Sequence, residues 1–247
     1  AIDLPTLKAD RRPVLPGGLA ILTAVVESFG VDRVSAVDGG LREGVLYDLH
    51  GRFQHDDVRD RTVWSFLRRF QVDEAQARRV EATAARLWSA IAAPAKLEDP
   101  FCRRLLGWSA RLHEVGLAIS HVGYHRHGEY LIRHARMDGF AQNDQTSLSI
   151  LVRLHRKKWA NELDDGFRHL GRDVGRWLVV ILRLAVLLNR SRDGDGAIEV
   201  NASVEGNTLA LSFGRAWLEA HPVTEADLAK EASVLAAQGY DLLVRGR

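Results

Sequence analysis

The stretch from Leu112 to His134 carries the residue types that most readily do chemistry. It reads LHEVGLAISHVGYHRHGEYLIRH and combines five histidines with two arginines and Glu114. Neutral imidazoles and carboxylates are good ligands for divalent metal ions, whereas histidines beside arginines suit a phosphate-rich anion. The sequence therefore raises two alternatives for this stretch, a metal site and an anion site.

The metal alternative is compared with a known ligand pattern, position by position. Hydrolases of the HD superfamily take a His from one helix, a His-Asp pair from a second helix and an Asp from a later one, and their metal activates water. The corresponding positions here are Gln76, the pair His113 and Glu114, and Val186. Because Gln is a poor ligand and Val is none, we expect a degraded HD motif with no metal bound to this chain.

The histidines fall into two groups by their surroundings. His155 shares a helical stripe with Leu148, Leu151 and Val152, which is typical of a buried histidine, and His113 has the same structural explanation. The second group follows a helix stop in a polar stretch, so we expect it to be exposed and to contact an anion. It consists of His121, His125, Arg126 and His127.

A second basic cluster lies at the end of the next predicted helix, in RLHRKK. Cations near a helix C-terminus complement the helix dipole, so a solvated helix end is one explanation and anion binding is the other. Two basic clusters on neighbouring helices favour a polyanion as the ligand. The second cluster consists of Arg153, Arg156, Lys157 and Lys158.

Residues 55–190 must position these clusters, and their pattern is helical throughout. Apolar periodicity predicts helices over 72–92, 100–116, 125–135, 142–158 and 173–190. The last of these is apolar almost all round, so we expect it to be the central, buried helix of an HD-like bundle.

The flanking segments differ in character from the bundle. Residues 1–54 predict a helix over 16–30, a short strand over 33–37 and a helix over 41–51. Since a single strand is not a sheet, we interpret them as the end of a larger α/β lobe. Residues 191–247 predict a hairpin, a helix beginning at Thr224 and a final strand, which form a small ββαβ domain. The fold class is thus mainly α with α+β parts.

Composition sets further limits. The 247 residues are 46% hydrophobic and 27% charged, which is ordinary for a globular protein. The net charge of +2 does not suggest a nucleic-acid-binding protein, and one cysteine suits a reducing cytoplasm. The apolar run WLVVILRLAVLL is too short to span a bilayer. We predict a cytoplasmic protein without a membrane span, and leave peripheral membrane association open.

Three motifs in order resemble the exopolyphosphatase and guanosine pentaphosphate phosphohydrolase family. They are VLPGGLAIL with VDGGLREGVLYDLHGRF, then LHEVGLAISHVGYHRHGEYLI, then LVRLHRKK with ILRLAVLLN. The resemblance implies the C-terminal half of a long member: the end of an actin-like lobe, an HD-like domain and a small α+β domain. It places the catalytic carboxylates upstream of this chain, so we expect no catalytic residue here. It also implies Mg²⁺ for the parent enzyme, a homodimer and an arginine near the ligand cleft at Arg11.

The functional hypothesis follows from the resemblance and the basic clusters together. We expect part of an exopolyphosphatase that binds inorganic polyphosphate and supports dimerisation. Guanosine pentaphosphate phosphohydrolase is the alternative, with guanosine tetra- or pentaphosphate as ligand. An HD-type metal-dependent phosphohydrolase is a further alternative, which Gln76 and Val186 argue against.

Overall fold

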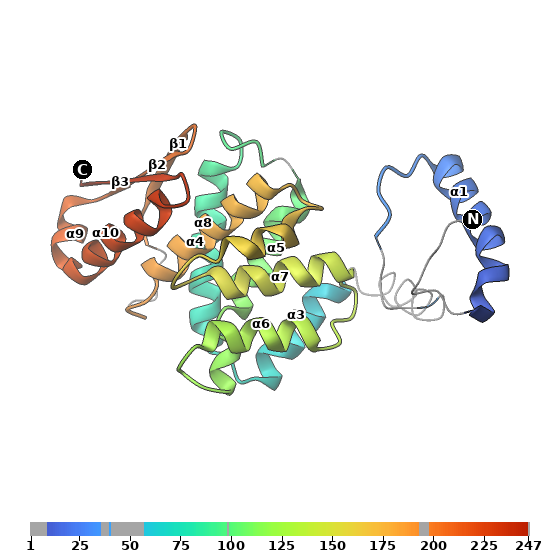
Figure 1. The fold of residues 1–247 in the computed structure, drawn as a ribbon. Helices are drawn as coiled ribbons and strands as arrows, with labels where there is room; N and C mark the ends of the chain where they lie inside the picture. Colours follow the sequence, from blue (N-terminus) through green and yellow to red (C-terminus); the bar gives the residue numbers. More distant parts are fainter. Residues whose placement is uncertain (1–8, 36–39, 41–56, 98, 193–197, 247) are drawn as a thin grey trace. The chain divides into compact units, whose positions relative to one another are not determined.

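The computed structural model describes residues 9–35, 40, 57–97, 99–192 and 198–246 (Figure 1). Contacts divide the chain into two units, residues 1–36 and 37–247. The predicted boundary at 54/55 lies outside the described residues, and the boundary at 190/191 stays a prediction.

The first unit contains a short 3-10 helix and one α-helix. The 3-10 helix is Ala9–Val14 and α1 is Leu15–Phe29, which ends at Gly30 with φ +58°, as the sequence predicts. The prediction of a strand over 33–37 is wrong at residues 33–35, which are not in a strand. A strand needs a neighbour for its ladder hydrogen bonds, and the described part of this unit offers none. The helix predicted over 41–51 and the rest of that strand lie outside the described residues.

The second unit begins with a group of helices, and the later members of this group carry the histidine-rich stretch. Three of them start at an aspartate whose carboxylate accepts a backbone N–H, namely Asp57, Asp73 and Asp99. The α-helices are α3 (Val58–Arg69), α4 (Glu74–Ile91), α5 (Pro100–Leu112), α6 (Tyr124–His134), α7 (Gln142–Leu154) and α8 (Arg172–Leu188). The 3-10 helices are η2 (Val115–Ala118) and η3 (Asn161–Phe167).

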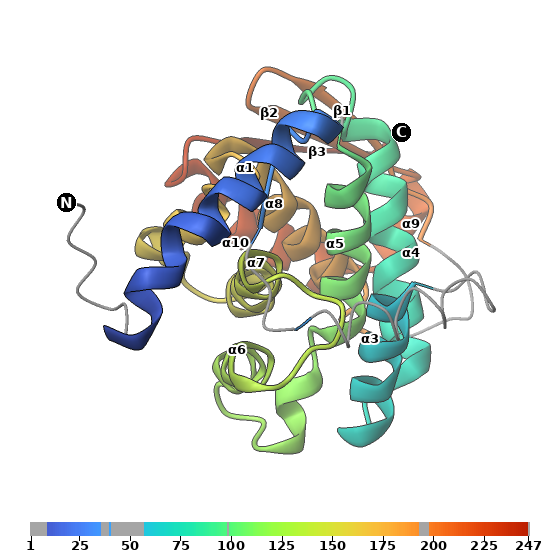
Figure 2. The ribbon, with the colours of Figure 1, turned by 90° about the vertical axis from the view of Figure 1, so that its right-hand side faces the viewer.

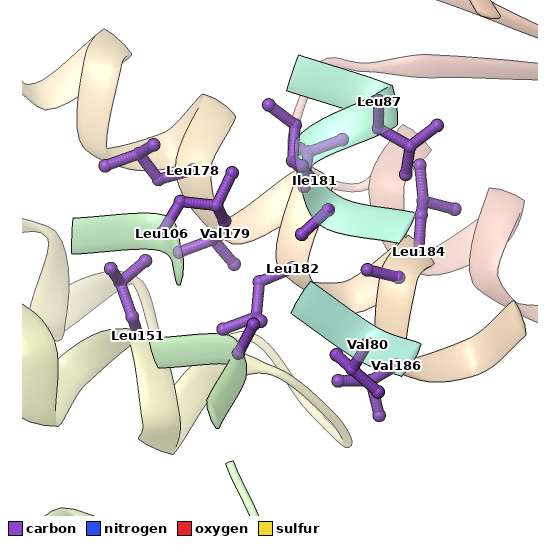
Figure 3. Packing of buried hydrophobic residues seen from close by; sticks show 14 of the residues in the cluster. Val80, Leu87, Leu106, Leu151, Leu178, Val179, Ile181, Leu182, Leu184 and Val186 are labelled. Atoms are coloured by element: carbon purple, nitrogen blue, oxygen red, sulfur yellow. The ribbon is translucent and has the colours of Figure 1, made fainter. Parts of the chain in front are cut away.

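Helix α8 is the centre of this unit, as the sequence predicts. Every residue from Trp177 to Leu188 is buried, and α4, α5 and α7 all pack against the helix. Figure 3 shows Val186 of α8 beside Val80 of α4, and Leu106 and Leu151 facing the other side of α8. The HD-like and actin-like comparisons stay predictions, while the mainly helical class is confirmed.

The C-terminal part has the predicted ββαβ order with one additional short helix. Strands β1 (Asn201–Glu205) and β2 (Thr208–Phe213) form an antiparallel hairpin that turns at Gly206, and β3 (Asp241–Gly246) pairs parallel to β2. Helices α9 (Arg215–Ala220) and α10 (Pro222–Ala236) lie between β2 and β3 in the chain. Thus α10 begins at Pro222, before Thr224. Helix α10 packs on β3 and α8, and β1 on α4, so the sheet shares the core of the helical region (Figure 1).

Candidate phosphate-binding site

Two basic segments of the sequence meet where α6 begins and α7 ends. The helices α6 and α7 lie side by side (Figure 2). Helix α6 follows Gly123, which has φ +71° and makes no capping hydrogen bond through a side chain. Uncapped N–H groups at a helix start attract anions. Helix α7 ends at Leu154, earlier than predicted, so Arg156, Lys157 and Lys158 lie in the loop that follows it.

Two glycines of the motif allow the chain to cross itself closely beneath this site. A Cβ atom at Gly116 would lie 2.0 Å from the carbonyl oxygen of Tyr124, and one at Gly128 would lie 2.8 Å from Val152 Cγ1. These glycines therefore bring η2 and α7 against α6. Gly128 leaves no room for a ligand, because it is buried against Val115 and Val152.

The rings of Tyr124, His113 and His155 cluster beside Arg156, and the two histidines are buried. The rings of His113 and His155 are 5.5 Å apart, and those of Tyr124 and His155 are 5.4 Å apart. His155 Nδ1 lies 2.6 Å from the carbonyl oxygen of Val152, so Nδ1 donates and Nε2 accepts from the Tyr124 hydroxyl at 3.3 Å. The expected burial of His113 and His155 is confirmed, since each is 1% exposed.

His125 is also buried, which corrects the prediction of an exposed residue. It is 8% exposed and its ring lies 6.3 Å from that of His155, because its side chain points from the first turn of α6 towards α7. Its Nδ1 atom has no hydrogen-bond partner among the described residues. An unpaired buried nitrogen beside a loop of cations is well placed to meet a ligand atom.

Burial keeps these histidines neutral. Burial, and after it the charges of Arg153, Arg156, Arg126 and Lys157, together lower the pKa of His125 to about 4. Burial likewise lowers the pKa of His113 and, to a greater extent, that of His155. A gain of anion affinity from protonation of His125 just below pH 7 is therefore not expected.

The charge of the site comes from three cations around His125, which we call the basic surface: Arg126, Arg156 and Lys157. All three interact electrostatically with His125, and the guanidinium of Arg156 lies 4.6 Å from the centre of the Tyr124 ring. No carboxylate forms an ion pair with any of them among the residues that the structure describes. These cations are therefore available to an anionic ligand.

A buried arginine holds the loop that carries the basic surface. Arg183 of α8 donates from Nη1 to the carbonyl oxygen of Leu154 at 2.7 Å and from Nη2 to that of Lys157 at 3.0 Å. It also forms a two-point ion pair with Glu231 of α10. Lys157 has a backbone φ of +64°, which few residues other than glycine adopt. Arg183 thus stabilises a strained loop geometry at the site.

The positions of the degraded HD motif hold hydrogen bonds and apolar contacts instead of a metal-type ligand set. Gln76 donates to the carbonyl oxygen of Asn189 at 2.7 Å and accepts from Arg79, so both ends of its amide are engaged. Val186 is buried in the core. Arg192 donates to Asp73 at 2.8 Å and to Glu114, so a guanidinium joins these two carboxylates. No group of metal-type ligands occurs within the described ranges.

The other predicted binding residues have varied positions. Arg153 forms an ion pair with Glu129 at 3.3 Å, so its charge is already partnered. His121 and Lys158 are exposed and His127 is half-buried. Arg11 is exposed in the first unit.

Sequence reasoning missed Tyr124 and the Arg183–Glu231 pair. Tyr124 lies within the motif, but nothing in the spacing indicated a ring beneath Arg156. The sequence did contain a sign that Arg183 is paired, because a charge inside an apolar helix needs a buried partner. The identity of that partner was not readable.

No helix in the described part of the chain combines the length and apolar character that crossing a bilayer requires.

Known proteins are similar to this chain over nearly all of its length. The family description "Ppx/GppA phosphatase, domain III" matches residues 58–232, and "Ppx/GppA phosphatase family" matches residues 1–53. A guanosine-5'-triphosphate,3'-diphosphate pyrophosphatase of Pseudoalteromonas translucida is 35% identical over 99% of this chain. Proteins of the same name from Photobacterium profundum and Vibrio vulnificus are 34% and 31% identical over 98% and 100% of it. The chain spans about half the length of these curated relatives, 48–49%.

Proposed function

Because the chain belongs to the Ppx/GppA phosphatase family, we propose that it is part of a phosphohydrolase that acts on guanosine 5'-triphosphate 3'-diphosphate. In this proposal the chain binds phosphate groups of the substrate, and the upstream half contributes the catalytic carboxylates and Mg²⁺. The observation that carries the binding role is the gathering of Arg126, Arg156 and Lys157 around His125 without an ion-paired carboxylate.

The setting of these cations favours phosphate over a merely solvated surface. Arg156 is held against Tyr124, and Arg183 holds the carbonyl of Lys157, so the loop is ordered before a ligand arrives. A preordered arginine grips two phosphate oxygens at a smaller loss of side-chain entropy than a mobile one. The start of α6 has no side-chain cap and lies next to Arg126, whose Cδ would be 3.9 Å from a Cβ atom at Gly123, so the first backbone N–H groups of the helix add to the site.

The names of the relatives favour guanosine pentaphosphate over inorganic polyphosphate as the substrate. All of the relatives described above are called guanosine-5'-triphosphate,3'-diphosphate pyrophosphatases. The names therefore support guanosine pentaphosphate phosphohydrolase, the alternative drawn from the sequence, over the first hypothesis of an exopolyphosphatase. Both ligands are polyanions, so the basic surface suits either. A competition between the two at equal phosphate concentration separates them: stronger displacement by guanosine pentaphosphate supports the proposal, and stronger displacement by polyphosphate contradicts it.

The binding role is tested by titrating this chain with inorganic tripolyphosphate in a calorimeter at two salt concentrations. The variant combines Arg126→Ala, Arg156→Ala and Lys157→Ala. The control removes the same charge at exposed positions elsewhere, with Arg168→Ala, Arg172→Ala and Lys230→Ala. We expect the first variant to bind at least about 10-fold more weakly, since a hydrogen bond to a charged group contributes roughly 1.5–3 kcal/mol. The salt dependence should also become shallower by about one counterion per lost cation.

An affinity and a salt dependence that stay at wild-type values in both triple variants would show that the basic surface is ordinary solvated surface. Equal losses in both variants would indicate a response to net charge alone, which also contradicts a site.

The resemblance further supports a homodimer, in which two copies of the basic surface are present in one particle. Light scattering over a tenfold concentration range tests this. A mass of one chain throughout would contradict the dimer.

A further inference from the structure

A pocket of about 380 Å³ lies beside Glu114 of the degraded HD motif, and no residue of the basic surface lines it. Its walls come from the end of α3, the loop leading into α4, and η2. Phe70, Val72 and Leu117 provide apolar surface, and the charged groups are Arg69, Asp73, Glu114 and Arg192. The volume is sufficient for a nucleobase.

Glu114 is the unusual member of this lining. It is 8% exposed, so its carboxylate is almost fully removed from solvent. Its Oε1 atom accepts from Arg192, but its Oε2 atom has no hydrogen-bond partner among the described residues. A buried carboxylate oxygen without a donor costs free energy, and such a group calls for a ligand donor.

Arg192, which pairs with the Glu114 carboxylate, determines which ligand fits beside the unpartnered Oε2 atom. Arg192 has five N–H donors and uses one from each Nη, on Asp73 and on Glu114 Oε1, so further donors remain on a guanidinium that contacts the Glu114 carboxylate. The pocket therefore presents an acceptor next to a donor. Guanine presents the complementary pair on one edge, with N1–H and the N2 amino group as donors and O6 as an acceptor.

We propose, resting on the function proposed above, that this pocket binds the base of a guanine nucleotide, with N1–H and the N2 amino group donating to Glu114 Oε2 and O6 accepting from Arg192. The apolar side chains Phe70, Val72 and Leu117 contact the faces of the base. Arg69, which is exposed at the end of α3 and forms no ion pair within the described ranges, meets the phosphate groups.

A metal ion would fit this pocket less well than a guanine base. A cation would need more oxygen ligands than the one unpartnered atom of Glu114, because Asp73 and the other oxygen of Glu114 already pair with Arg192. The guanidinium of Arg192 would also repel a cation placed beside it.

The test measures binding of GDP, IDP, ADP and inorganic pyrophosphate to the 247-residue chain by calorimetry. IDP has the same edge without the N2 amino group, and pyrophosphate has no base. We expect GDP to bind about 10-fold more tightly than ADP, since a well-placed base contact contributes roughly 1–3 kcal/mol of discrimination. IDP should fall between them, and pyrophosphate should bind most weakly.

The variants assign this preference to the pocket. Glu114→Gln should reduce GDP affinity about 10-fold and leave pyrophosphate binding unchanged, whereas Arg69→Ala should weaken both. Glu81→Gln is the matched control, because Glu81 is also an ion-paired glutamate, with Arg111, and does not line this pocket. Ala118→Trp places a large side chain at an exposed position of the rim and should block GDP without touching the core.

The result also distinguishes this proposal from the phosphate-binding role of the basic surface. A preference for GDP that persists in the Arg126, Arg156 and Lys157 triple variant and disappears in Ala118→Trp supports the pocket. Equal affinities for GDP and ADP, or unchanged GDP binding in both Glu114→Gln and Ala118→Trp, overturns it.

Discussion

Arg183 and Glu231 form a buried ion pair that joins the central helix α8 to α10. Nη2 of Arg183 lies 3.0 Å from Oε2 of Glu231, and Nε donates to Oε1. The same guanidinium donates to two backbone carbonyls at the end of α7. One side chain therefore connects the C-terminal ββαβ part to the loop that carries Arg156 and Lys157.

Removing one partner of this pair should be strongly destabilising. We expect Glu231→Gln to lower the free energy of unfolding by about 3 kcal/mol, because it leaves a buried guanidinium without its counter-charge. Urea denaturation measures this. The double variant Arg183→Met with Glu231→Leu should cost less than the sum of the single changes. Arg78→Gln, in an exposed pair with Glu74, is the control and should change stability by less than about 0.5 kcal/mol. A loss for Glu231→Gln no larger than this control would contradict a structural role.

Gly116 should not tolerate a side chain. Its Cβ atom would meet two backbone atoms, the carbonyl oxygen of Tyr124 at 2.0 Å and the amide nitrogen of Gly128 at 2.5 Å. Gly116→Ala should therefore lower the unfolding free energy by more than about 3 kcal/mol, measured by urea denaturation. Gly107→Ala is the control, because its Cβ would meet only the flexible end of Glu81, and alanine favours the middle of α5 by about 1 kcal/mol. Similar effects of the two changes would rule out the close crossing of η2 and α6.

Stability should fall as the pH decreases from about 6.5 towards 4. The pKa of His125 is lowered to about 4, so the unfolded chain takes up a proton in this range before the folded chain does. The contribution of neutral His125 is therefore complete above pH 6.5 and is lost as the pH falls through 4. His113 and His155 act in the same direction. Thermal unfolding at intervals from pH 7 to 4 measures this, and His125→Asn should give a shallower decline. The same decline in wild type and variant would contradict a lowered pKa at His125.

The purified chain should contain no tightly bound transition metal at His113 and Glu114. Arg192 already pairs with both Glu114 and Asp73, and Val186 provides no ligand. Elemental analysis after dialysis checks this. About one metal ion per chain that is lost on His113→Ala would refute the prediction.

The chain alone should release no phosphate from polyphosphate or guanosine pentaphosphate, because the resemblance places the catalytic carboxylates upstream of it. A phosphate-release assay with Mg²⁺ tests this. Turnover near one per second, which is within the usual range of enzymes, would contradict it.

Much of the helical fold was readable from the sequence because its determinants are local. The all-round apolar character of residues 177–188 predicted the central helix, and the Leu148, Leu151 and Val152 stripe predicted burial of His155. The hairpin of β1 and β2 followed from alternation and the turn at Gly206. The predicted strand over residues 33–37 failed at 33–35 because a strand depends on a partner, which a local pattern does not reveal.

The arrangement of the site depended on contacts between distant residues. The sequence identified Arg126, Arg156 and Lys157 by their charge, but it treated His125 as exposed and Arg153 as available. Packing of α6 on α7 buried His125, and Glu129 paired with Arg153. The partner of Arg183 lies 48 positions along the chain and that of Glu114 lies 78 positions along it. Residue type and spacing thus determined which charges the chain carries and which helices hold them. Only the tertiary structure decided which charges neutralise each other, because that depends on distances across the folded core.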